Sequence, residues 1–350
     1  MRVVTDGTAA GGVTLTIDAT IQYAAERIAD SSFRRGAIVV ADCATGELLA
    51  LVSRPNYDQN DVGASIEKND TSLLDRTRTA YNVGSVYKPV IACAALDAGV
   101  SETFTYECAG EIEVDGVVYS CNNGKAHGKM TLESALAQSC NTYFIALGQK
   151  VGAQAIYNTA QALGLGSALT LCEGFTTAKG SFPSEAALES SAAELCNHSF
   201  GQGKLLLTPM HIAAYTMCIA NGGIYRELSV VKSVGGEAAP AAREKRAVGE
   251  TAANTAAAAM REAMLTGTGA GGAPQTVSSA GKTGTAQTGA YNDDGSEVVI
   301  GWFTGFFPAE EPRYAVTVMV ETEGYGYASA APVVGRLADV IAAYEAEKTA

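Results

Sequence analysis

The sequence is short of several features that would assign it to common protein classes. It has no run of eighteen apolar residues, which excludes a membrane-spanning helix within this chain. Basic residues number 24 against 37 acidic residues, and the formal net charge of −13 argues against nucleic acid as a partner. Eight cysteines in 350 residues are too few for a disulfide scaffold. The sequence also has no signal-peptide pattern and no internal repeat.

The composition is that of a folded domain. Apolar residues make up 47% of the chain and charged residues 17%, which permits a large core and excludes global disorder. After Met1, a linker-like stretch at 8–12 leads directly into a strand-like segment at 13–17. We therefore expect a domain cut from a longer protein, with any targeting segment or membrane anchor outside this chain.

Strand patterns occur at both ends of the chain, and helix patterns dominate between them. Strands are predicted at 37–41, 48–52, 280–288, 298–307 and 314–321, and terminal helices at 19–31 and 332–347. Between the two groups of strands, capping and stop signals predict a helix at 209–220. An Ala-rich segment predicts a second helix at 250–265.

Two hairpin strands do not form a stable sheet alone, so strands from both ends are expected to share one sheet. The predicted fold is of the α/β (α+β) class. An antiparallel sheet of about five strands is flanked by the N- and C-terminal helices and carries an inserted all-helical lobe. We expect a single domain over 1–350, with a sheet lobe at about 13–55 and 270–350 and a helical lobe at about 56–269. A ligand cleft is expected where the lobes meet.

Three short motifs carry the candidate chemistry. Ser85 and Lys88 are three residues apart at the start of an apolar helix, which places an amine beside a hydroxyl. Ser139 and Asn141 lie at a predicted joint between two helices and can point into a cleft. The similar Ser120-Cys121-Asn122 is interpreted as turn chemistry. Lys282-Thr283-Gly284-Thr285 lies on a predicted strand, where an edge position would offer backbone groups to an extended peptide.

Each motif alone is common, but the three in this order are a signature of β-lactamases and penicillin-binding proteins. The chain resembles the transpeptidase domain of class B (monofunctional) penicillin-binding proteins, of the serine penicillin-recognising superfamily, over nearly its whole length. Where that family usually has a proline before the Gly-Ser pair, this chain has Val83. The further matching stretches are Leu15-Thr16-Ile17-Asp18, Thr45-Gly46-Glu47-Leu48, His127-Gly128, Phe200-Gly201-Gln202-Gly203, Ala220-Asn221-Gly222-Gly223 and Trp302-Phe303-Thr304-Gly305.

The resemblance implies a peptidoglycan D,D-transpeptidase that acts on D-alanyl-D-alanine stem peptides and is acylated by β-lactams. Ser85 would be the nucleophile and Lys88 its base, which requires a pKa near 7 at a cost of roughly 4–5 kcal/mol. Burial and the charge of Lys282 are expected to lower this pKa. Ser139 would pass a proton to the leaving amine, and Asn141 would orient Lys88.

The same resemblance implies that Lys282, Thr283 and Thr285 hold the terminal carboxylate, beside Gly284. The amides of Ser85 and Thr285 would form the oxyanion hole. The enzyme would work at the extracytoplasmic face of a bacterial membrane and would need no cofactor for catalysis.

A second group of residues raises the question of a metal. Cys108, Cys121, His127 and Cys140 lie within 33 residues and match in number the ligands of a structural zinc. Some relatives carry metal ligands or paired cysteines in this stretch. The open alternatives are a zinc site, a disulfide (Cys121–Cys140 or Cys108–Cys121) and separate buried thiols. Under each of these alternatives Cys140 is next to Ser139 in the chain. The bonding of Cys140 is therefore expected to affect how well ordered the active site is.

Two other functions are open from the sequence. A serine β-lactamase would need a base for deacylation, and Glu194 with Asn197 is the nearest pair, with unsuitable spacing. A β-lactam-sensing module would carry the same three motifs but transfer the acyl group to no acceptor.

Overall fold

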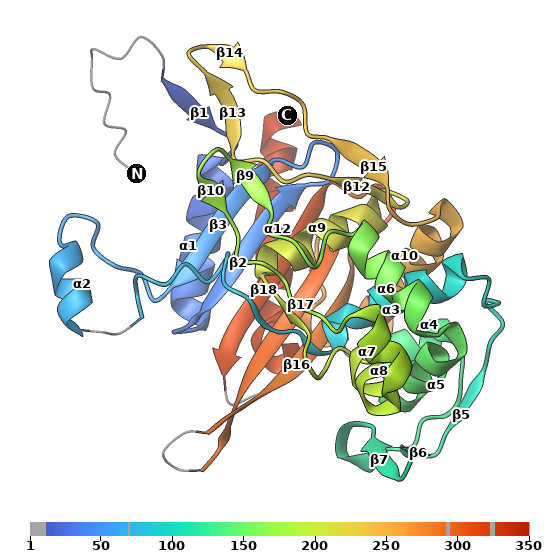
Figure 1. Ribbon diagram of the computed structural model, residues 1–350. Coiled ribbons are helices and arrows are strands. Elements are labelled where there is room, and N and C mark those ends of the chain that lie inside the picture. Colours follow the sequence, from blue (N-terminus) through green and yellow to red (C-terminus); the bar gives the residue numbers. More distant parts are fainter. Residues whose placement is uncertain (1–11, 69–70, 292–294, 323–325, 350) are drawn as a thin grey trace.

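A five-stranded antiparallel sheet, in the order β16-β17-β18-β2-β3, forms the centre of the molecule. The structure is a computed structural model that describes residues 12–68, 71–291, 295–322 and 326–349. Figure 1 shows the N-terminal strands in blue beside the C-terminal strands in orange and red, and β18 pairs directly with β2. The predicted sheet built from both chain ends is confirmed. Its strands are β2 (Gly36–Asp42), β3 (Leu48–Arg54), β16 (Ala280–Tyr291), β17 (Glu297–Phe307) and β18 (Tyr314–Thr322).

Helices cover both faces of this sheet. On one face α1 (Ala19–Ser32) and α12 (Ala331–Thr349) share a hydrophobic core with Ile38 and Val40. On the other face Val39 and Ala41 pack in a second core, together with α9 (Pro209–Ala220) and the inserted helices. Successive residues of β2 point to opposite faces, so a strand covered on both sides has few polar positions. Both terminal helices were predicted within two residues of their observed ends.

The helix predicted from its capping residues at 209–220 is confirmed as α9. The side chain of Thr208 accepts a hydrogen bond from the amide of His211, and Pro209 occupies the first turn of α9. The predicted helix at 250–265 is confirmed at both ends. The remaining helices are α2 (Val62–Lys68), α3 (Lys88–Asp97), α4 (Leu132–Ala137), α5 (Asn141–Val151), α6 (Ala153–Ala162), α7 (Glu185–Ser190), α8 (Ala192–Ser199), α10 (Glu250–Leu265) and α11 (Gly326–Ser329).

The prediction of an all-helical insertion is wrong in one respect, because short strand pairs lie among the helices. Strands of two to four residues are too short to show the alternation that identifies longer ones. The bounds predicted for the two lobes stay a prediction. The pairs are β4 (Tyr81–Asn82) with β11 (Leu206–Leu207), β5 (Tyr106–Cys108) with β8 (Gly128–Met130), β6 (Glu111–Val114) with β7 (Val117–Ser120), β9 (Thr170–Cys172) with β10 (Phe175–Thr176), and β12 (Ile224–Arg226) with β15 (Glu244–Arg246).

The first strand of the described chain belongs to a small sheet that is separate from the central one. The segment predicted as a strand at 13–17 forms β1 (Val13–Leu15), which pairs with β13 (Val231–Val234), and β13 pairs in turn with β14 (Glu237–Ala238). Of the linker-like stretch at 8–12, all but Gly12 lies outside the described residues. Among the helices of the described ranges, none combines the length and apolar content needed to cross a bilayer.

Candidate active site

Ser85 lies in a tight turn at the start of a buried helix. A 3₁₀ helix over Gly84–Tyr87 leads directly into α3, whose first residue is Lys88. Gly84 has a φ of 69°, which is unfavourable for any residue with a Cβ, and a Cβ there would lie 2.5 Å from the carbonyl oxygen of Thr285. The turn therefore packs its backbone directly against β16.

Ser139 lies at the joint between α4 and α5, as predicted. Its φ of 57° is in the left-handed region, which a serine rarely adopts. The joint is fixed by a hydrogen bond of 2.8 Å from the Cys140 amide back to the Ala135 carbonyl oxygen. Asn141 then begins α5. The strained backbone turns the chain so that Ser139 and Asn141 both reach the amine of Lys88.

The Lys88 ammonium joins the first two motifs. Its Nζ donates to the Ser139 carbonyl oxygen at 2.8 Å, to Ser139 Oγ at 3.2 Å and to Asn141 Oδ1 at 2.7 Å. The same Nζ lies 5.5 Å from the centre of the Phe144 ring. Three acceptors thus hold an amine that is completely shielded from solvent.

Burial has a large effect on this amine, because desolvation disfavours the charged form. It lowers the pKa of Lys88 to about 7, while the thiols of Cys140 and Cys121 act in the opposite direction. Burial, and after it the charge of Lys88, holds the pKa of Lys282 well below its usual range. Desolvation is therefore the cause that lowers the pKa of Lys88, and the charge of Lys282, which was also expected to lower it, is not among the causes.

The third motif lies on β16, an edge strand of the central sheet. A Cβ on Gly284 would lie 2.9 Å from the Val86 amide nitrogen, so glycine allows the strand to approach the Ser85 turn closely. The Thr283 hydroxyl hydrogen-bonds to Thr268 Oγ1 at 2.7 Å. The Lys282 side chain is fully buried, and its Nζ donates to the Thr283 carbonyl oxygen at 2.8 Å.

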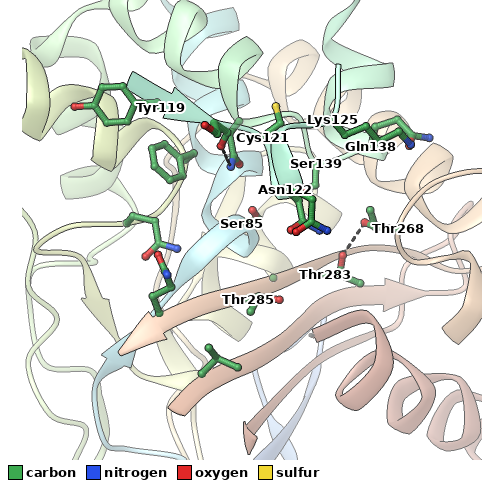
Figure 2. Close-up of a pocket in the computed structure, with 18 of the residues that line it drawn as sticks. Ser85, Tyr119, Cys121, Asn122, Lys125, Gln138, Ser139, Thr268, Thr283 and Thr285 are labelled. Atoms are coloured by element: carbon green, nitrogen blue, oxygen red, sulfur yellow. Dashed lines mark hydrogen bonds between the residues drawn. The ribbon is translucent and has the colours of Figure 1, made fainter. Parts of the chain in front are cut away.

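These segments meet at a cleft of about 950 Å³. Figure 2 shows Ser85 in the middle of the view, between Ser139 and Thr285. Lys88 and Lys282 are fully buried and do not line the cleft. The predicted site residues that do line it are Ser85, Ser139, Asn141, Thr283, Gly284, Thr285, Cys121 and His127.

The interpretation of Ser120 as a residue of a turn is incomplete. Instead of serving only in a turn, Ser120 ends β7, lines the cleft, and accepts a hydrogen bond of 3.1 Å from Asn141 Nδ2 on its carbonyl oxygen. Asp115 and Gly116, with φ of 49° and 78°, form the turn between β6 and β7. An Asp-Gly pair between valines is a strong hairpin signal that would have predicted this strand pair.

The sequence interpretation also missed several residues that line the cleft. They come from the β7 hairpin and the segment after it, the end of α4, the turn after α8, the segment after α10, and strands β16 and β17. Those with side chains suited to contact a ligand are Tyr119, Asn122, Lys125, Gln138, Phe200, Gln202, Thr268, Gln287 and Glu297. Phe200 and Gln202 belong to a stretch that supports the family resemblance, but that stretch assigns no role to either.

The four candidate metal ligands come together beside this cleft. The Sγ atoms of Cys108 and Cys121 lie 3.7 Å apart, those of Cys121 and Cys140 also 3.7 Å, and Cys108 Sγ lies 3.4 Å from His127 Nδ1. All four ligand atoms lie within 4.8 Å of one another. Each cysteine is free, so neither of the two disulfides that the sequence left open as alternatives is formed in the structure. This buried group of three thiols and an imidazole could hold a metal ion.

Two of these thiols are coupled to each other. A hydrogen bond of 3.7 Å joins the Cys121 and Cys140 sulfurs, and it lowers the pKa of Cys121 and raises that of Cys140. Thr142 Oγ1 lies 3.4 Å from Cys140 Sγ and 3.8 Å from Cys121 Sγ. Cys140 therefore belongs to the sulfur group, while its neighbours Ser139 and Asn141 bind Lys88.

Comparisons with known proteins agree with the fold and the motifs. The family described as the penicillin binding protein transpeptidase domain matches residues 36–339. The chain is 32% identical over 330 residues to peptidoglycan D,D-transpeptidase PbpA of Mycobacterium tuberculosis. The matched region covers 85% of this chain and 65% of that relative. The chain thus spans slightly less than two thirds of the length of this relative.

Solved structures are similar over almost the whole chain. The D,D-transpeptidase domain of a peptidoglycan glycosyltransferase from Eggerthella lenta superposes with a TM-score of 0.87 at 29% identity, covering 97% of this chain and 85% of that one. Penicillin-binding protein A of M. tuberculosis, in an acyl-enzyme complex with ceftriaxone, gives a TM-score of 0.83 at 30% identity and covers 94% of this chain and 80% of that one.

Proposed function

Because the chain belongs to the penicillin-binding protein transpeptidase domain family, we propose that it carries the D,D-transpeptidase activity of a peptidoglycan-synthesising enzyme. It would transfer the acyl group of a D-alanyl-D-alanine stem peptide to an acceptor amine, and β-lactams would acylate the same serine. The observation that carries this proposal is the buried Lys88 amine, held by Ser139 and Asn141 behind a cleft that Ser85 lines.

Acylation begins at Ser85. Neutral Lys88 takes the proton from Ser85 Oγ, and Oγ forms a bond to the carbonyl carbon of the penultimate D-alanine. The tetrahedral intermediate then collapses, and the C–N bond to the terminal D-alanine breaks. Ser139, which receives a hydrogen bond from Lys88, passes the proton to the departing amine. An acceptor amine later attacks the ester carbon by the reverse sequence and frees Ser85.

Binding and charge stabilisation come from β16 and the Ser85 turn. The hydroxyls of Thr283 and Thr285, which line the cleft, would donate hydrogen bonds to the terminal carboxylate. Lys282 is fully buried and does not line the cleft, so the direct contact with the carboxylate expected from the resemblance would not form in this arrangement. The amides of Ser85 and Thr285 would bind the developing oxyanion, where removal of one donor costs about 2.7–4 kcal/mol. The absence of a side chain at Gly284 supports this arrangement, because it lets β16 lie against the amide nitrogens of the Ser85 turn.

We propose that the Cys108, Cys121, His127 and Cys140 group holds a structural zinc ion. A tetrahedral zinc with Zn–S near 2.3 Å and Zn–N near 2.0–2.1 Å places its ligand atoms roughly 3.5–3.8 Å apart, and three ligand pairs here are separated by 3.4–3.7 Å. Bound zinc would fix Cys140 and thereby the joint that presents Ser139 and Asn141. Protein purified without chelator should contain about one zinc per chain; metal-free protein with thiols that do not react would favour a disulfide.

The place of action follows from the reaction. Peptidoglycan stem peptides are cross-linked outside the cytoplasmic membrane, so we expect this domain at the extracytoplasmic face of a bacterial membrane. The membrane contact would be made by an anchor elsewhere in a longer protein, in keeping with the share of the M. tuberculosis relative that this chain covers. The expected partners are stem peptides and β-lactams.

Two experiments test this function. After penicillin G is added, intact-mass spectrometry should show one adduct that persists for many minutes, and Ser85→Ala should abolish it. A D-alanyl-D-alanine peptide should release D-alanine faster when an acceptor amine is added. Rapid adduct loss with turnover would identify a β-lactamase instead, and a stable adduct without D-alanine release would identify a sensor. Glu194, the deacylation base that the β-lactamase alternative would need, forms an ion pair of 2.7 Å with Lys204 and does not line the cleft.

A further inference from the structure

The cleft carries opposite charges in separate places. Among the described residues that line it, Glu297 is the only carboxylate and Lys125 the only ammonium. Figure 2 shows Lys125 with Gln138 on the side of Thr283 and Thr268, whereas Tyr119 lies across the cleft from them. Glu297 is the first residue of β17. Its carboxylate accepts a hydrogen bond from Gln287, which lies on β16 two residues after Thr285, so Glu297 lies beyond the Thr285 end of the motif. The cleft is thus positive near Thr283 and negative beyond Thr285.

Glu297 is half-buried and held in place by two donors. Gln287 Nε2 donates to its Oε2 at 3.1 Å, and the Gly289 amide donates to its Oε1 at 3.3 Å. A carboxylate offers about four lone-pair positions, so these two contacts leave capacity to accept hydrogen bonds from a ligand. The carboxylate is therefore oriented at the cleft without being saturated.

The edge of β16 determines which part of a substrate would meet Glu297. In the proposed complex, the terminal carboxylate lies by Thr283 and the reacting carbonyl lies by the Thr285 amide. An extended donor peptide advances about 3.3 Å per residue along the strand edge. The residue that precedes D-alanyl-D-alanine therefore falls beside Gln287, within reach of Glu297.

We infer that Glu297 is a specificity-determining residue that binds the side-chain ammonium of a diamino acid immediately before the D-alanyl-D-alanine of the donor peptide. This inference rests on the proposed function and narrows its substrate class. A donor with a carboxylate on its last residue and a side-chain ammonium two residues earlier matches the charges of the cleft in one orientation only. The same complementarity would fix the register of the peptide on β16.

The alternative role for Glu297 is closure of the β16-β17 hairpin. Glu297→Gln separates the two roles, since its amide oxygen can still accept from the Gly289 amide while the charge is lost. Glu113→Gln is a matched control, because Glu113 is an exposed carboxylate on β6 that does not line the cleft.

The experiment is a competition between two donor peptides in one tube. Nα-acetyl-L-lysyl-D-alanyl-D-alanine and its norleucyl counterpart differ only in the amine, and their consumption with glycine as acceptor gives the ratio of kcat/KM directly. We expect a lysyl-to-norleucyl ratio of about five in the parent protein and in Glu113→Gln, a size set by one partly exposed ion pair. The ratio should fall to about one in Glu297→Gln, and in the parent protein it should decrease as NaCl is raised.

Three outcomes decide the question. A ratio that stays near five in Glu297→Gln overturns the role of Glu297, and so does a parent ratio near one. Penicillin G should still label Ser85 in Glu297→Gln, which shows that the variant is folded with Ser85 in place. If neither donor loses D-alanine while penicillin G still labels Ser85, the transpeptidase function itself fails, and the inference fails with it.

Discussion

Removal of the Asn141 side chain should shift the pH dependence of acylation toward acid. Lys88 can accept the Ser85 proton only when it is neutral, so acylation should rise with pH through the pKa of Lys88, which burial lowers to about 7. At pH 7 about half of the protein would then have a neutral Lys88, compared with about one molecule in three thousand for an amine with a pKa of 10.5. The rate should level off about one pH unit above the midpoint.

Asn141 Oδ1 accepts one of the hydrogen bonds that stabilise protonated Lys88, at 2.7 Å. A hydrogen bond to a charged group contributes about 1.5–3 kcal/mol, and 1.36 kcal/mol corresponds to one pKa unit. Loss of this acceptor raises the free energy of the charged form and therefore lowers the pKa. In Asn141→Ala the midpoint of acylation should move from near pH 7 to about pH 6, and the plateau should fall because Lys88 is held less firmly.

The assay is the second-order rate constant of acylation by nitrocefin between pH 5 and pH 9. Asn158→Ala, at an exposed position on α6, is the control and should retain the parent profile. Thermal unfolding shows whether each variant is folded. A parent profile that is flat over this range, or a midpoint that moves upward in Asn141→Ala, would refute Lys88 as the base. The charged and titratable groups facing Lys88 are Lys282, Cys140 and Cys121.

Three further predictions follow from buried groups around the site. Gly84→Ala should lower the free energy of unfolding by about 1–3 kcal/mol in a urea titration, because its φ is positive and its Cβ would lie 2.5 Å from the Thr285 carbonyl oxygen; unchanged stability would contradict this close packing. Burial lowers the pKa of His198 to about 4, so unfolding takes up a proton below pH 6.5 and stability should fall by about 3 kcal/mol between pH 6.5 and pH 4. His198→Asn should lose that part of the pH dependence, and an identical slope in both proteins would show that His198 is not buried in its neutral form. Cys108→Ala should reduce bound zinc and slow penicillin acylation together; full acylation without metal would separate the two sites.

The sequence predicts the long elements well because they carry strong signals. The strands at both chain ends have apolar runs bounded by turns, and α10 begins and ends at the predicted residues 250 and 265. The short strand pairs were not predicted, because three or four residues are too few to establish the alternation of apolar and polar residues that identifies a strand. For β6 and β7 the missing information was available in the Asp115-Gly116 turn. That hairpin brings Tyr119 to the cleft. Because the turn was not recognised in the sequence, Tyr119 was not predicted as a candidate binding residue either.

The candidate site could be predicted only through the resemblance, because its parts are far apart in the chain. Spacing alone places Lys88 one turn from Ser85, but nothing local indicates that Asn141 or Thr285 meets them. The contacts depend on backbone packing, in which Gly84 lies against the Thr285 carbonyl oxygen. Residues such as Thr268 and Gln287 also line the cleft because of this packing, and no motif marks them.

The joint at Ser139-Cys140-Asn141 links two parts of the molecule that the sequence treats separately. Ser139 and Asn141 bind the Lys88 amine, while Cys140 between them lies 3.7 Å from Cys121 in the sulfur group. Asn141 also donates to the carbonyl oxygen of Ser120, the residue before Cys121. We therefore expect a change in the bonding of either cysteine to shift the backbone that positions the base. The left-handed φ of Ser139 supports this expectation, because a strained conformation persists only where the surrounding structure holds it.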